Sequence, residues 1–212
     1  MMVLLYFVII FGISPFLYFL VARRQSAIEL KAILPYVFLT FISSLYEFFG
    51  TLTFGWNVSY WFLIYDILDF SCIFYFFYII LQKKHFWIFV AFLVLFAALC
   101  SFLYWQYEIK DFIVVNNYFK GFITFFVLLF SVLWFTKLFA EVYIEDLLNN
   151  STFYFISGFV LYYCGTLFLF LLSNYLYHSD SVLFQSYWVV NIVLNFVLRM
   201  LLLVGLWKAR VN

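Results

Sequence analysis

Two sets of polar side chains interrupt apolar stretches of this chain, and their spacing places each set on one helix face. Asp66 and Asp69 are spaced i, i+3, so both carboxylates would lie on the same side of a helix. Asn191, Asn195 and Arg199 follow at i, i+4 and i+8, which again gives a single face. A charged group in hydrocarbon is costly unless it is paired or hydrated. We therefore expect these faces to point at one another rather than at lipid.

A third polar stripe runs along the preceding apolar stretch at helical spacing, and its members are Thr40, Ser43, Ser44, Glu47 and Thr51. Together the stripes predict a polar core that binds a ligand or ion or couples a conformational switch, formed by Asp66, Asp69, Asn191, Asn195 and Arg199 with Glu47 near the outer rim. At about 1.5 Å per residue, Asp69 and Arg199 would differ in depth by about 10 Å. The long arginine side chain, with Asn195 as a relay, would close most of that gap. The alternative is that these groups only hold the helices together and set their register.

The composition excludes an ordinary soluble domain. Of the 212 residues, 69% are hydrophobic and 10% are charged, whereas soluble domains have about 45–50% apolar and about 25% charged residues. The formal net charge of +1 gives no indication of nucleic acid as a partner. The sequence therefore predicts an integral membrane protein that contacts the lipid bilayer.

Seven stretches are long and apolar enough to cross about 30 Å of hydrocarbon as helices. They are Val3–Ala22, Ala32–Gly50, Tyr60–Gln82, Phe86–Trp105, Gly121–Ala140, Phe153–Ser173 and Leu183–Trp207. Their polar and apolar residues do not alternate with the period of a barrel strand. We predict an all-α polytopic membrane protein with seven transmembrane helices in a single domain over residues 1–212.

The distribution of basic residues predicts the orientation. With the N-terminus outside, eight basic residues face the cytoplasm, namely Arg23, Arg24, Lys31, Lys83, Lys84, Lys137, Lys208 and Arg210. Only Lys110 and Lys120 then fall on the outer side. The first apolar stretch has no basic residues before it, unlike a cleavable signal peptide, so we expect a retained helix.

Short similarities suggest an internal duplication. Three segments recur in order at offsets of 119, 115 and 127 residues: Phe7–Gly12 with Phe126–Ser131, Gly50–Leu52 with Gly165–Leu167, and Ser59–Trp61 with Ser186–Trp188. They pair the first three helices with the last three, which predicts a parallel three-plus-one-plus-three repeat. The alternative is chance similarity among Phe- and Leu-rich helices.

Several kinds of chemistry find no support. The last helix carries Arg199 where a retinal protein needs a lysine, and the two histidines, His85 and His178, fall near opposite membrane faces. Motifs for phosphate loops, nucleophile elbows and dinucleotide binding are missing. The sequence predicts no catalytic residue, metal site or cofactor. We expect the three cysteines to be buried apolar residues. We expect the acidic run Glu141, Glu145 and Asp146 to be a solvated loop rather than a surface that docks a partner.

The C-terminal third carries LFLFLLSNY at Leu167–Tyr175, then Trp188, Asn191 and Asn195, and GLWKAR at Gly205–Arg210. In these features the chain resembles a family of small, uncharacterised seven-helix proteins of bacterial inner membranes. Genes of that family often neighbour those of sensor histidine kinases. The resemblance implies a bacterial plasma-membrane location and a membrane signalling partner such as a histidine kinase.

Three classes of function remain open. The first is a non-enzymatic sensory or accessory signalling module whose polar core binds a small molecule and acts through a partner. The second is a small-solute transporter with an architecture similar to SWEET-type and PnuC-type repeats, although their signature motifs are missing. The third is an enzyme of lipid chemistry. The polar residues concentrate toward the outer half of the expected bundle, which favours sensing over transport.

Overall fold

The structure is a computed structural model, which describes residues 2–21, 28–56, 58–82, 85–107, 112–141, 144–179 and 181–211. The described residues form helices and contain no strand, which confirms the all-α prediction. In chain order the elements are α1 (Met2–Val21), α2 (Ile28–Leu45), the π-helical η1 (Tyr46–Thr53), α3 (Val58–Ile80), α4 (Phe86–Gln106), α5 (Phe112–Glu141), the 3-10 helix η3 (Ile144–Asn149), α6 (Ser151–Ser179) and α7 (Ser181–Val211).

Six apolar stretches among the described residues are long enough to cross a bilayer, and a shorter apolar helix, Tyr6–Val21, lies before them. The six belong to α2 with η1, α3, α4, α5, α6 and α7. Every backbone N–H and C=O in hydrocarbon needs a partner, and helices supply these partners internally. The architecture is that of a multi-pass helical membrane protein.

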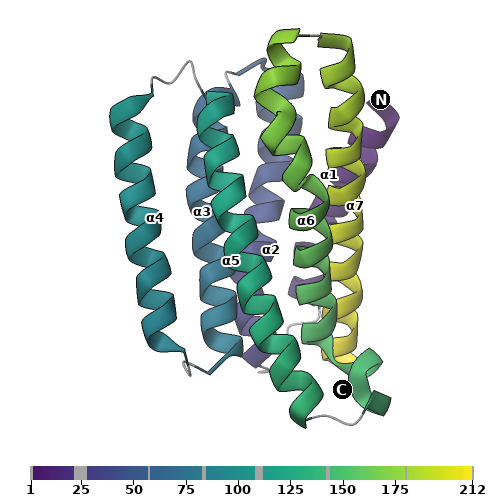
Figure 1. Cartoon of the computed structure of the whole chain (residues 1–212). Helices are drawn as coiled ribbons and strands as arrows, with labels where there is room; N and C mark the ends of the chain where they lie inside the picture. The colour runs from purple at the N-terminus through teal and green to yellow at the C-terminus, as the bar shows by residue number, and fades with distance from the viewer. Residues whose placement is uncertain are drawn as a thin grey trace.

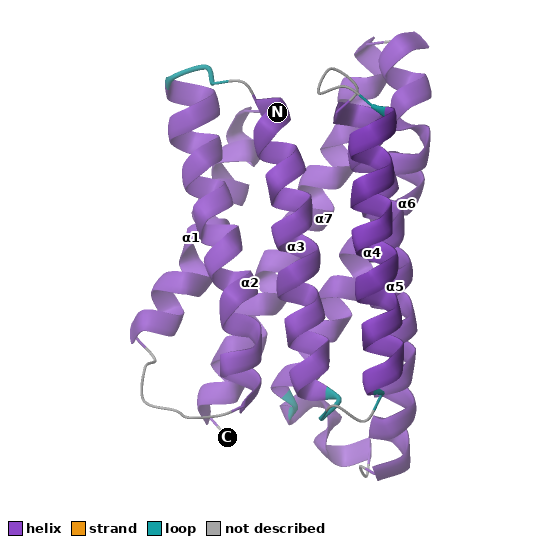
Figure 2. Cartoon of the chain, turned by 90° about the vertical axis from the view of Figure 1, so that its left-hand side faces the viewer, coloured by secondary structure: helices purple, strands orange, loops and turns teal. Residues whose placement is uncertain are grey.

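The helices stand side by side as a bundle, with the chain ends at opposite ends of it (Figures 1 and 2). α6 and α7 form a close antiparallel pair, and α1 packs against α7. α4 lies at the edge of the bundle, beyond α3 and α5 (Figure 1). α4 therefore covers the outer side of α3 and α5.

Phenylalanine rings attach α4 to the bundle. Phe96 stacks on Phe70 of α3 at 3.9 Å between ring centroids, and Phe89 meets Phe130 of α5 at 4.2 Å. The opposite face of α4 is open, as Trp87 shows with 80% exposure. Because one face is apolar and buried and the other apolar and exposed, α4 has the pattern of a helix between protein and lipid.

The same aromatic core continues into the half of the bundle in which α2 begins and α7 ends. Phe76, Phe77, Phe155 and Phe159 are all completely buried, and Ile33 of α2 packs in the same core. The rings of Phe76 and Phe159 meet edge to face at 5.4 Å. This half of the bundle is therefore a close-packed apolar core.

The position of α5 corrects the sequence analysis. The helix begins at Phe112, well before the expected start at Gly121. Lys120 was assigned to the outer side of the membrane, but it lies within α5 and is only 5% exposed. Asn116 and Lys120 interrupt the apolar sequence near the start of α5, so the continuous apolar stretch begins later than the helix does. Both side chains are nevertheless buried.

Candidate functional site

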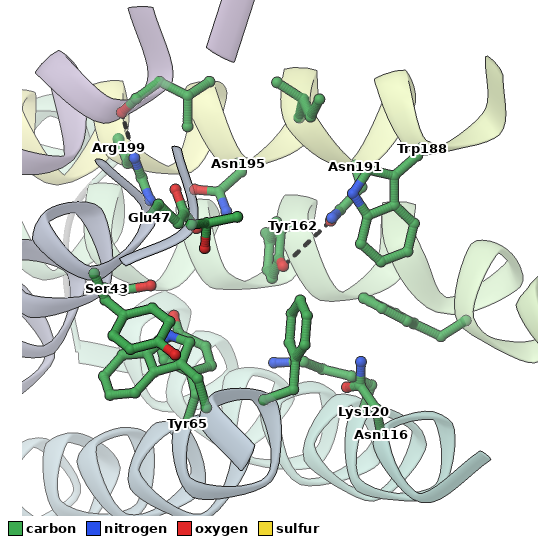
Figure 3. A pocket seen from close by; sticks show the side chains of 17 residues that line it. Ser43, Glu47, Tyr65, Asn116, Lys120, Tyr162, Trp188, Asn191, Asn195 and Arg199 are labelled. Atoms are coloured by element: carbon green, nitrogen blue, oxygen red, sulfur yellow. Dashed lines mark hydrogen bonds between the residues drawn. The ribbon is translucent and has the colours of Figure 1, made fainter. Parts of the chain in front are cut away.

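A partly enclosed cavity of about 380 Å³ occupies the other half of the bundle, where α2 ends and α3 begins (Figure 3). The described residues that line it come from α1, from α2 with η1, and from α3, α5, α6 and α7, and none belongs to α4. Ligand cavities in proteins usually measure about 300–1,000 Å³. The space is thus large enough for a small metabolite.

Four of the six residues predicted for the polar core line this cavity: Glu47, Asn191, Asn195 and Arg199. Glu47, Asn195 and Arg199 group at one end, and Asn191 lies farther along α7 near Trp188 (Figure 3). The spacing argument for α7 thus placed its three polar side chains on the correct face.

The other two predicted residues, Asp66 and Asp69, form a separate buried cluster with Lys120. The Lys120 Nζ lies 3.0 Å from Asp66 Oδ1 and 2.8 Å from Asp69 Oδ2. The Tyr163 hydroxyl donates a hydrogen bond of 2.6 Å to Asp69 Oδ2. We call Asp66, Asp69, Lys120 and Tyr163 the ionic cluster. It joins α3, α5 and α6 by charge-assisted contacts, which are stronger than neutral hydrogen bonds.

Among the described residues Asp69 pairs with Lys120 rather than with Arg199, whose hydrogen bond goes to Val8. Lys120, four residues after Asn116 on α5, is the cation that Asp69 meets. Lys120 also lines the cavity, so one ammonium group belongs to both the ionic cluster and the cavity wall. It lies 5.2 Å from the ring centroid of Tyr65, another cavity residue, which adds a cation–π contact.

Arg199 is as deeply buried as Lys120 but has weaker partners. It is 2% exposed, and its Nη1 donates a hydrogen bond to the Val8 carbonyl of α1. Its Nε has no hydrogen-bond partner among the described residues. A neutral carbonyl compensates the cost of burying a positive charge less well than a carboxylate would, so an anion beside the guanidinium would be stabilised.

A glycine of α1 makes room for this guanidinium. A Cβ atom at Gly12 would collide with Ser44 Oγ of α2 and with the Nη1 of Arg199. The close approach of α1, α2 and the Arg199 side chain therefore requires glycine at this position.

Aromatic rings form much of the cavity wall. Tyr46 of η1 stacks on Trp61 of α3 at 4.5 Å and 15°. Across the cavity the Tyr162 hydroxyl donates to Asn191 Oδ1 at 3.3 Å (Figure 3), and Trp188 meets Phe170 edge to face. The walls are thus apolar but carry several polar groups at fixed positions.

The π-helical turn η1 holds one side of the cavity. It extends α2 and brings Tyr46, Glu47 and Thr51 to the cavity lining. π-helical segments are rare and often occur at functional sites because they redirect side chains.

Sequence reasoning missed Lys120, Tyr163, Asn116 and the aromatic wall. A signal for two of them was present: Asn116, Lys120 and Thr124 are spaced i, i+4, i+8 like the residues of α7, and all three are buried. Extending the fifth helix toward the N-terminus would have revealed a fourth polar stripe. Tyr163 had no such signal, because tyrosine is frequent throughout the chain.

The remaining chemistry-bearing residues gather nowhere else among the described residues. Cys72, Cys100 and Cys164 are free and partly buried. No group of three or more His, Cys, Asp or Glu side chains suited to a metal occurs in the described parts of the chain. The side chains of Glu141, Glu145, Asp146 and His178 lie outside the described residues.

Comparison with known proteins finds no family model, no curated protein and no solved structure that matches this chain. The resemblance based on Leu167–Tyr175 and Gly205–Arg210 stays a prediction.

Proposed function

We propose that this protein is a sensory or accessory signalling module of the bacterial plasma membrane, in which a small molecule bound in the cavity changes the packing of the helices. The observation that carries the proposal is the position of Lys120. Its ammonium lines the cavity and also pairs with Asp66 and Asp69, so a ligand that packs against this wall would change the contacts of α3 and α6 with α5.

The shape of the interior supports sensing over transport. The cavity occupies one half of the bundle, and the completely buried rings of Phe76, Phe155 and Phe159 fill the other half. A close-packed core resists the opening of a second access route, because displaced rings leave costly voids. The blind cavity suits a ligand that enters and leaves on the same side.

The proposal includes seven membrane crossings with the N-terminus outside and the C-terminus in the cytoplasm. Because Lys120 is buried within α5, only Lys110 remains of the two basic residues assigned to the outer side, against eight at the other end. This strengthens the positive-inside asymmetry. The cavity then lies in the outer half of the membrane, and the apolar core in the cytoplasmic half.

One observation favours a transporter as the second candidate. The described cavity residues come from α1–α3 with η1 and from α5–α7, and α4 supplies none. This is the arrangement expected if two three-helix repeats enclose a substrate site and α4 connects them. The repeat itself is part of this proposal.

Crosslinked affinity purification from native membranes tests the two candidates. The wild type, Arg199→Gln and Phe168→Leu are purified in parallel, and mass spectrometry identifies proteins and small molecules. Phe168 is 71% exposed on α6 and serves as the lipid-facing control.

The sensor proposal predicts a reproducible membrane signalling partner, such as a histidine kinase, that Phe168→Leu retains and Arg199→Gln loses. Equal recovery by all three forms would separate the cavity from partner binding and contradict the proposal. A bound metabolite without a partner, together with its uptake into proteoliposomes, would establish the transporter instead.

A further inference from the structure

The polar groups at one end of the cavity define the chemical class of its ligand. We propose that the cavity recognises a small zwitterion of the α-amino acid type, whose carboxylate pairs with Arg199 and whose ammonium pairs with Glu47. The inference rests on the proposed function, since it assumes that the cavity is a ligand site.

Arg199 provides the anion-binding half of the site. Its guanidinium is buried, and among the described residues its Nε lacks a partner and its one hydrogen bond goes to the neutral Val8 carbonyl. No carboxylate of the described residues lies within ion-pairing distance of it. A planar guanidinium binds a carboxylate or a phosphate through two parallel N–H···O bonds.

Glu47 provides the cation-binding half. It lines the same end of the cavity as Arg199 (Figure 3), and the two charges attract each other. They form no ion pair in the structure, and Glu47 has no hydrogen bond to any described residue. The two side chains are thus near each other but not in contact. A ligand with adjacent charged groups would fit between them, with its carboxylate toward Arg199 and its ammonium toward Glu47.

Asn195 lies beside both charges at this end of the cavity (Figure 3). Its amide offers both a donor and an acceptor, so it can bind either group of a zwitterion. Asn195, Arg199 and Glu47 together thus match the ammonium and carboxylate groups of one α-amino acid.

The charge balance disfavours ions of a single sign. Arg199 and Glu47 cancel formally, and a zwitterion preserves that balance within the membrane. A simple anion would gain from Arg199 but meet repulsion from Glu47, and a simple cation would meet the reverse. Lys120 does not alter this argument, because Asp66 and Asp69 already hold its ammonium.

The cavity walls favour an apolar or aromatic side chain on the ligand. Beyond the charged end the lining includes the stacked rings of Tyr46 and Trp61, together with Phe62 and Trp188. Rings of this kind gain from stacking and from burial of apolar surface. An amino acid with a large side chain would fill the space better than glycine.

Thermal unfolding of the full-length protein in detergent tests this proposal. Each proteinogenic L-amino acid is added separately, and the one that raises the melting temperature most is compared with its decarboxylated amine and its deaminated acid. A ligand that binds only the folded state raises the melting temperature with concentration. We expect both single-charge analogues to bind about tenfold more weakly or worse, as the loss of a charge-assisted pair implies.

Variants assign the two halves of the site. Arg199→Gln and Glu47→Gln should each abolish the ligand-induced shift, whereas Arg210→Gln and Glu29→Gln should retain it, because neither Arg210 nor Glu29 lines the cavity. A cooperative melting transition in the absence of ligand shows that a variant is folded. Arg199→Lys and Glu47→Asp replace any variant that lacks this transition.

Two results would overturn the proposal: no amino acid stabilises the protein, or an analogue with one charge binds as well as the zwitterion. If the native-membrane purification still recovers a signalling partner together with another metabolite, and both depend on Arg199, the ligand class is wrong and the proposed function stands. If it recovers neither partner nor metabolite, the proposed function fails as well.

Discussion

The two buried cations of the cavity, Lys120 and Arg199, are similarly shielded from water but have different partners. Lys120 is 5% exposed and contacts two carboxylates at 3.0 and 2.8 Å. Arg199 is 2% exposed and donates to a backbone carbonyl. Lys120 is thus held by two direct ion pairs, whereas Arg199 makes no direct ion pair with the described residues.

This difference separates structural from binding roles. A buried ion pair contributes little net stability when formed, but removing one partner is costly because the other charge stays buried. Lys120 has two such partners, whereas the only described partner of Arg199 is neutral. The ionic cluster should therefore control stability, and Arg199 should control binding.

The largest predicted effect is that of Lys120→Met, which leaves Asp66 and Asp69 side by side without a counter-ion. We expect a loss of about 3–5 kcal/mol in the free energy of unfolding, the usual cost of breaking a buried ion pair. Unfolding titrations with a denaturing detergent would measure it. The variant with Asp66→Asn and Asp69→Asn added is the control, and it should recover much of the loss. Equal losses in both variants would show that the charges are not the cause.

The second prediction compares two adjacent tyrosines. Tyr163→Phe removes a 2.6 Å hydrogen bond to the Asp69 carboxylate and should cost about 1.5–3 kcal/mol, as for bonds to charged groups. Tyr162→Phe removes a 3.3 Å bond to the neutral Asn191 amide and should cost about 0.5–1.5 kcal/mol. The same unfolding titrations apply. The reverse order of the two losses would contradict the role given to the ionic cluster.

The third prediction concerns the space that α1 leaves for Arg199. In Gly12→Ala the new methyl group would press on Ser44 and the guanidinium, with an expected cost of about 1–3 kcal/mol, as for other overpacked sites. Gly121→Ala is the matched control, because a Cβ there meets nothing within 4 Å. That control should be neutral or stabilising, since alanine favours helix by about 1 kcal/mol over glycine. Similar losses in both variants would mean that helix flexibility, not the close approach to Arg199, requires glycine.

The sequence was sufficient to predict the helices and the polar face of α7, for identifiable physical reasons. The bilayer imposes a minimum apolar length, so spanning helices are visible as long apolar stretches. Asn191, Asn195 and Arg199 share a face because the helical period is fixed. The prediction that these three residues share an environment with Glu47 agrees with the cavity lining.

The pairing between helices was not predictable in the same way. Which cation meets Asp69 depends on the depth, tilt and neighbours of each helix, and none of these follows from helical periodicity. The burial of Lys120 was not predicted because inward-facing polar residues make the start of α5 less apolar. Hydropathy therefore indicates a start of this helix that is too late. The π-helical geometry of η1 likewise has no simple sequence signature.

The smallest predicted effect on stability is that of Arg199→Met. The substitution removes a hydrogen bond to the Val8 carbonyl, but it also removes a buried charge that has no anionic partner among the described residues. These contributions oppose each other, so we expect a change of about 1 kcal/mol or less in the free energy of unfolding. Methionine occupies similar space and adapts to irregular packing, so a cavity effect should not dominate.

Measured beside Lys120→Met, this variant is the decisive test of the comparison between the two cations. A loss as large as that of Lys120→Met would mean that Arg199 is a structural anchor, and the case for a charge without a direct ion pair would fail. A small loss of stability combined with complete loss of the ligand-induced melting shift would separate folding from binding at one residue. That result is expected only if the charge of Arg199 is retained for a group that the protein itself does not supply.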